Sequence, residues 1–191
     1  PYLVLINPMS GAGKARNLFH ECIKPVWSEA NVSYVIIETN YSKHAIDLMK
    51  TMSLDEWRGV IVVSGDGLLY EVINGLMDRS DWPEAVKTPV AQLPGGSANA
   101  FACSAAHLSN EKYAEVSLEQ FAQNMAFYLV KAERVPLDLI KLQLCDNSTV
   151  HAFLGVEYAF IADVDLESEA YRFLGNLRFT LGAVIRLASK K

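Results

Sequence analysis

Cysteine, long apolar runs and net positive charge are all scarce in this sequence of 191 residues. The three cysteines lie far apart without C-x-x-C spacing, which argues against a disulfide framework and favours reduced thiols in a cytosolic protein. No stretch of 18 uncharged apolar residues is present, so we expect no transmembrane helix. A net charge of −5 argues against a nucleic-acid partner, because neutralising phosphates requires clustered Lys and Arg.

The chain does contain enough apolar material for a packed core. Its composition is 51% apolar and 20% charged, which excludes a disordered chain. The length fits one domain, or one small domain followed by part of a second. The four histidines show no metal-ligand spacing, so the sequence predicts no metal site built from side chains.

Short apolar runs alternate with segments of helical period through the first two-thirds of the chain. The alternation predicts βαβ units, and so an α/β domain with a parallel, Rossmann-like sheet. The predicted strands cover residues 2–6, 32–39, 59–63 and 89–93. The predicted helices cover residues 15–30, 42–52, 68–77, 97–106 and 117–131.

The pattern changes after residue 131. Two apolar segments, 137–144 and 151–161, flank a polar turn at residues 146–148, which predicts an antiparallel hairpin. Residues 169–191 have helical character to the last residue, so we expect the chain to be part of a longer protein. We predict an α/β domain over residues 1–133 and an incomplete second domain over residues 134–191.

Three loops rich in small residues follow predicted strands: NPMSGAGK (7–14), SGDG (64–67) and LPGGSANA (93–100). Open parallel sheets bind ligands at this edge, and a helix start offers free N–H groups to phosphate. The first loop is no Walker P-loop, because Pro8 and Ala15 stand where that motif needs Gly and Ser or Thr. Each loop alone could be only a tight turn, but three at successive strand ends favour a shared phosphate-binding crevice.

Asp66 is the candidate catalytic residue of the second loop. Glycines on both sides let the backbone approach a ligand closely. Phosphoryl transfer needs positioning, charge neutralisation and a group that accepts the proton of the acceptor hydroxyl. The sequence therefore predicts Asp66 as a general base.

These motifs resemble those of the lipid kinases of the diacylglycerol kinase superfamily. The resemblance rests on Asn7-Pro8, on SGDGLLYEVINGL (64–76) and on LPGGS (93–97). Within the superfamily, FIADVDLESE (160–169), Tyr171-Arg172 and LRFTLG (177–182) resemble the sphingosine kinases. Ser64 supports this narrower resemblance, because diacylglycerol, ceramide and NAD kinases typically have Gly at that place.

The resemblance spans nearly the whole chain and implies a phosphofructokinase-like nucleotide domain, followed by a β-sandwich that binds the lipid. It implies ATP as co-substrate, with Mg²⁺ carried by the nucleotide. It assigns ATP binding to Asn7, Pro8, Met9, Thr39, Asn40, Tyr41, Ser42, Lys43, Glu71, Gly96, Ser97, Ala98, Arg172 and Arg178. It assigns lipid-substrate binding to Ser64, Gly65, Gly67, Asp165, Phe160, Ile161, Val164 and Phe179.

Several of these assignments have a plainer alternative. Glu71 could be a stabilising charge near a helix N-terminus, and the two arginines could be solvated. The apolar residues around Asp165 could be core rather than a surface for a hydrocarbon tail. Met9 and Ala12 stand where relatives often have basic residues, so nucleotide affinity could differ.

Asp165 belongs to an acidic cluster with Asp163, Glu167 and Glu169. One interpretation is helix N-terminal acidity with Asp165 as the cap. The other, which the resemblance supports, is a site for the ammonium group of sphingosine.

The resemblance therefore implies an ATP-dependent kinase that phosphorylates the primary hydroxyl of sphingosine to give sphingosine 1-phosphate. The alternatives are a kinase acting on ceramide or diacylglycerol, and a non-catalytic module that binds nucleotide or lipid. A lipid substrate further implies a cytoplasmic protein with transient, peripheral membrane contact.

Overall fold

The computed structural model describes residues 1–131, 133–174 and 177–189, without the side chains of 172 and 173. The chain forms two compact units, Pro1–Phe153 and Leu154–Lys191. Among the described residues, no helix is both long and apolar enough to cross a membrane.

The first unit is built on a parallel sheet of four strands in the order β2-β1-β3-β4. The strands are β1 (Tyr2–Ile6), β2 (Tyr34–Glu38), β3 (Val60–Ser64) and β4 (Val90–Pro94). Every residue of β3 is buried, as expected for an apolar, β-branched strand covered on both faces. The predicted α/β class and parallel sheet are confirmed.

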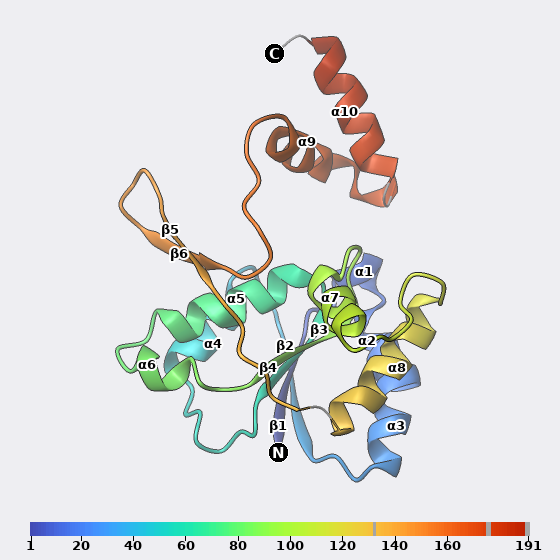
Figure 1. Ribbon diagram of the computed structural model, residues 1–191, viewed down its shortest axis with the longest axis vertical. Helices are drawn as coiled ribbons and strands as arrows, with labels where there is room; N and C mark the ends of the chain where they lie inside the picture. Colours follow the sequence, from blue (N-terminus) through green and yellow to red (C-terminus); the bar gives the residue numbers. More distant parts are fainter. Residues whose placement is uncertain (132, 175–176, 190–191) are drawn as a thin grey trace. The chain divides into compact units, whose positions relative to one another are not determined.

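Helices cover both faces of this sheet (Figure 1). One face packs against α2 (Ala15–Leu18), η1 (Phe19–Ile23), α3 (Lys24–Glu29), α7 (Ala100–Leu108) and α8 (Leu118–Lys131). The other packs against α4 (His44–Thr51), α5 (Asp66–Met77) and α6 (Trp82–Ala85). Alternate β1 residues enter the two cores, with Val4 and Ile6 in one and Leu3 and Leu5 in the other.

The segment predicted as one helix over residues 15–30 contains a π-helical turn at η1. Pro25 follows at the start of α3, where its missing N–H cannot complete a regular helical ladder. The wider turn absorbs this break, and Phe19 and Trp27 remain fully buried on the same core.

The predicted hairpin is present as β5 (Ile140–Gln143) paired antiparallel with β6 (Thr149–Ala152). The second predicted strand, 151–161, is wrong beyond Ala152, because residues 153–159 form neither strand nor helix and Phe160 begins α9 (Phe160–Ser168). Val164 and Ser168 are its buried residues, and their spacing of four is helical. A short, mostly apolar run does not distinguish strand from helix by itself.

The second unit contains α9, the 3₁₀ helix η2 (Glu169–Leu174) and α10 (Leu177–Ser189). Gly182 allows α9 and α10 to pack closely, because a Cβ there would lie 3.2 Å from the Ser168 Cβ. The helical prediction for 169–191 agrees with the structure over 169–174 and 177–189, and its other residues lie outside the described part of the chain. The hairpin belongs to the first compact unit. The predicted domain boundary between residues 133 and 134 was placed where the strand–helix alternation of the sequence ends, and it stays a prediction.

Candidate active site

The three glycine loops meet at the carboxyl edge of the sheet. β1 lies between β2 and β3, so the chain reverses its direction across the sheet beside β1, where open sheets bind ligands. The Ser10 and Ser64 hydroxyls lie 2.5 Å apart and join the loops after β1 and β3. The Gly95 N–H donates to the Ser64 carbonyl at 3.2 Å and joins the loop after β4.

Two of the glycines are required by contact between backbones. A Cβ on Gly96 would lie 2.3 Å from the Gly65 Cα, and one on Gly11 would lie 2.6 Å from the Gly95 carbonyl oxygen. Gly67 differs, because a Cβ there would meet nothing within 4 Å. The loops are thus packed against one another, and open space remains beside Asp66.

Asp66 is the first residue of α5, and its carboxylate joins α5 to the N-terminus of α7. Oδ2 accepts from the Ala100 N–H at 3.0 Å and Oδ1 from the Phe101 N–H at 2.9 Å. The positive end of a helix favours a carboxylate at this place. Since a carboxylate has about four lone-pair positions, Asp66 can still accept a hydrogen bond from a substrate hydroxyl.

Two buried residues that the sequence analysis did not select shape the third loop. Asn99 accepts from the N–H groups of Gly95 (3.1 Å) and Gly96 (2.8 Å) and donates to the Gly96 carbonyl. Gln92 donates to the Ser64 carbonyl at 3.1 Å and accepts from the Ala102 N–H at 3.0 Å. A polar residue within a buried apolar strand needs such partners. Gln92 could therefore have been selected as a structural residue of the site from the sequence alone.

Glu71 contacts backbone amides at the start of α4. Its two oxygens accept from the Lys43 N–H at 3.0 Å and from the Ala45 N–H at 3.2 Å. Lys43 has a left-handed φ of 70°, which these bonds help to hold. Glu71 therefore is a charge near a helix N-terminus, which is the plainer alternative, but that helix is α4 rather than its own helix α5. The contact of Glu71 with ATP stays a prediction.

The other residues predicted for ATP border these loops. The Asn7 side chain accepts from the Met9 N–H at 3.0 Å, and Met9 is 80% exposed. Thr39 is buried, and its N–H donates to the Ile6 carbonyl. Of the remaining first-unit residues of the prediction, Pro8 lies in the loop after β1, and Ser97 and Ala98 lie in the loop after β4. Asn40, Tyr41 and Ser42 lie in a fourth loop, between β2 and α4.

In the second unit the acidic cluster is paired with two arginines of α10. Arg178 contacts Asp165 at 3.3 Å and also pairs with Glu169. Arg186 contacts Asp163 at 2.5 Å and also pairs with Glu167. Two residues that were predicted to bind different substrates, Asp165 and Arg178, thus contact each other.

The interpretation of Asp165 as a helix cap is wrong, because α9 already begins at Phe160. Val164 is buried within this unit, whereas Phe160, Ile161 and Phe179 are exposed. The Phe179 ring lies under the Arg178 guanidinium, 4.3 Å from its centroid. The Arg172 side chain lies outside the described part of the structure.

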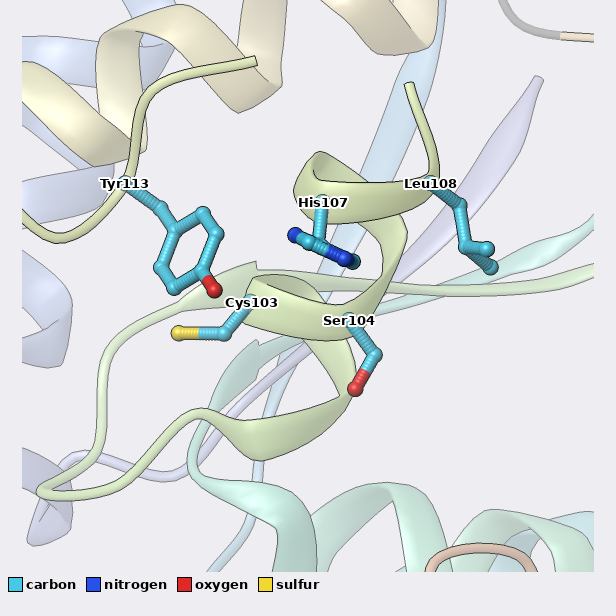
Figure 2. Close-up of a pocket in the computed structure, with 5 residues that line it drawn as sticks. All are labelled: Cys103, Ser104, His107, Leu108 and Tyr113. Atoms are coloured by element: carbon cyan, nitrogen blue, oxygen red, sulfur yellow. The ribbon is translucent and has the colours of Figure 1, made fainter. Parts of the chain in front are cut away.

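A separate hollow of about 350 Å³ lies on α7 and was not predicted (Figure 2). Cys103, Ser104, His107 and Leu108 line it from the helix, and Tyr113 faces them from the following loop. Burial, and secondarily the charge of Asp66, raise the pKa of the Cys103 thiol. At neutral pH the thiol is therefore protonated.

Comparisons with known proteins agree with this arrangement. Human sphingosine kinase 1 is 42% identical over 187 residues, which cover 98% of this chain and 48% of that protein. Sphingoid long chain base kinase 4 of Schizosaccharomyces pombe is 35% identical over 189 residues, 99% of this chain and 39% of that protein. The chain thus spans about half the length of these curated relatives, or less.

A crystal structure of a putative diacylglycerol kinase from Bacillus anthracis has the same fold. Its TM-score is 0.54 at 22% identity, over 72% of this chain and 42% of that one. The diacylglycerol kinase catalytic domain family matches residues 1–135, which contain all three glycine loops. By these matches the chain belongs to the diacylglycerol kinase catalytic domain family, as its loop motifs predicted.

Proposed function

We propose that the protein is an ATP-dependent lipid kinase that transfers the γ-phosphoryl group to the primary hydroxyl of a sphingoid base such as sphingosine. The observation that carries the proposal is the Asp66 carboxylate, oriented by two amides of α7 where three glycine loops meet. The similarity to proteins named sphingosine kinase supports the choice of substrate.

In this mechanism the protein positions the two substrates and neutralises charge. The glycine loops let the backbone approach the nucleotide phosphates closely, and Asp66 accepts the proton of the attacking hydroxyl. Among the residues that the structure describes, no three metal-ligating side chains gather at one place. We therefore propose that Mg²⁺ is held mainly by the nucleotide phosphates and supplies further charge neutralisation there.

Asp165 is the proposed partner of the substrate ammonium group. Its carboxylate is about half exposed, so an amine can approach it and compete with Arg178. A long hydrocarbon tail contributes on the order of 10 kcal/mol at ~0.8 kcal/mol per buried methylene, whereas a charge-assisted hydrogen bond contributes about 1.5–3 kcal/mol. The tail therefore supplies affinity, and Asp165 supplies selectivity for the amine.

The test is phosphorylation of a lipid panel by the full-length protein with labelled ATP. The panel contains sphingosine, dihydrosphingosine, ceramide and diacylglycerol, and we expect preference for the first two, which carry a free amine. Preference for ceramide or diacylglycerol would refute the proposed substrate. Nucleotide binding without turnover of any lipid would instead indicate a non-catalytic module.

A second experiment tests the ammonium contact. The Asp165→Asn variant should raise the KM for sphingosine far more than the KM for ATP. Asp163→Asn is the matched control, because Asp163 also pairs with an arginine of α10. Equal changes in both KM values would contradict the assignment.

A lipid substrate also leads us to propose a cytoplasmic protein with transient membrane contact.

A further inference from the structure

We propose that Asn74 is a positioning residue that anchors the β5–β6 hairpin to α5, the helix that begins with Asp66. The hairpin leads directly into residue 154 and the segment that carries Asp165. Asn74 thus ties the strand that precedes this segment in the chain to the helix that carries the catalytic carboxylate. Its consequence for the lipid rests on the proposed function, whereas the contact itself does not.

Asn74 makes two hydrogen bonds to the backbone of a single residue of β6. Its Oδ1 accepts from the His151 N–H at 2.8 Å, and its Nδ2 donates to the His151 carbonyl at 2.9 Å. The second Nδ2 hydrogen reaches the Tyr70 carbonyl, also at 2.9 Å. The side chain is thus a surrogate strand partner for β6, with both amide hydrogens used.

The position of Asn74 makes this arrangement selective for Asn. The residue is 6% exposed in the interior of α5, where a polar amide costs free energy unless it is hydrogen-bonded. The His151 N–H and carbonyl face Asn74 rather than β5, so without the amide both would lose their partners. Asn74 therefore satisfies part of the free edge of β6.

A second contact attaches the hairpin to α7. The Phe153 ring packs edge-to-face on Phe101, with centroids 5.5 Å apart and planes at 83°. The Phe101 N–H is itself one of the two donors to Asp66. The hairpin is therefore attached to both elements that hold the Asp66 carboxylate, through Asn74 on α5 and Phe101 on α7.

The test compares Asn74→Asp, which preserves shape, with Asn74→Ala in the full-length protein. At neutral pH the introduced carboxylate faces two carbonyl oxygens and loses both donated hydrogen bonds. We expect hydrogen-exchange protection of the β6 amides to fall by about tenfold or more, with β1 and β3 unchanged. The KM for sphingosine should rise by roughly the same factor, and the KM for ATP should stay within about twofold.

Exchange measured at acidic pH distinguishes loss of the Asn74 hydrogen bonds from a general loss of stability. Burial beside carbonyl oxygens raises the pKa of the introduced carboxyl, and its protonated form regains one O–H donor. Mild acid should therefore restore much of the β6 protection in Asn74→Asp and none of it in Asn74→Ala. Asn124→Asp on α8 is the control, because Asn124 accepts an exposed hydrogen bond from the Gln120 side chain of the same helix.

Each outcome decides the proposal. Unchanged exchange in β6 would refute the anchor, and lost protection with unchanged KM for sphingosine would refute the positioning role. Equal rises in both KM values would also refute it. A wild-type protein inactive toward every lipid would refute the proposed function and with it the positioning role, while exchange and its recovery in acid would still decide the anchor.

Discussion

Replacing Asp66 with Asn removes a charge and turns one hydrogen-bond acceptor into a donor. In the structure both oxygens accept from backbone N–H groups of α7, at 3.0 and 2.9 Å. The new NH₂ group must face one of these N–H groups, so at least one charge-assisted bond is lost, at about 1.5–3 kcal/mol. Loss of the charge at the helix N-terminus adds about 0.3–1 kcal/mol.

Because the site is partly exposed, we expect Asp66→Asn to lower the free energy of unfolding by about 2–3 kcal/mol. At about 2–4 °C per kcal/mol, the Tm should fall by about 5–10 °C. Loss of the general base should lower kcat by about 10²–10⁴-fold. Calorimetry measures the first effect, and labelled-ATP transfer to sphingosine, well below the variant's Tm, measures the second.

Gln92→Leu is the control that separates the two effects. Gln92 also bonds an α7 amide, at Ala102, without contacting the Asp66 carboxylate. It should lower the Tm comparably while kcat falls far less than in Asp66→Asn. Turnover by Asp66→Asn within tenfold of the wild type would refute the base role, and an unchanged Tm would refute the coupling to α7.

Three other predictions follow from single contacts. Gly96→Ala should abolish nucleotide binding, because its Cβ would lie 2.3 Å from the Gly65 Cα, whereas Gly67→Ala should fold normally; calorimetry with ADP titration distinguishes them. Arg79→Ala should lower stability by about 2 kcal/mol in urea unfolding, because the guanidinium donates to carbonyls at the end of α4; rescue by Lys would contradict the need for its fork geometry. Because its pKa is raised, Cys103 should react with iodoacetamide slowly at neutral pH and faster as pH rises; a rate independent of pH would contradict this.

Strands and helices followed from local patterns where one periodicity dominated. The apolar run at residues 59–63 predicted the strand that became β3, and the apolar face of residues 68–77 predicted the helix that became α5. The segment after Ala152 was misassigned as strand, because its mostly apolar run shows no single period, and a helix begins at Phe160. Packing of Val164 and Ser168 against α10 decided for the helix.

The site divides in the same way. The glycine loops at successive strand ends were evident in the sequence, because parallel strands bring their carboxyl ends to one edge. Their mutual contacts were not evident, since the approach of Gly96 to Gly65 depends on how two separate turns pack. The pairing of Asp165 with Arg178 likewise depends on the packing of α9 and α10.

The sequence by itself determined the α/β class, the three loops, Asp66 as candidate base and the lipid-kinase family, because short-range periodicity and motif chemistry carry this information. Only the tertiary structure decided what each polar group bonds. It showed that Asp66 joins α5 to α7, that Glu71 caps α4, and that Asn74 pairs with a strand 77 positions later. Such partners are set by long-range packing, in which buried polar groups must find hydrogen bonds wherever the fold brings them.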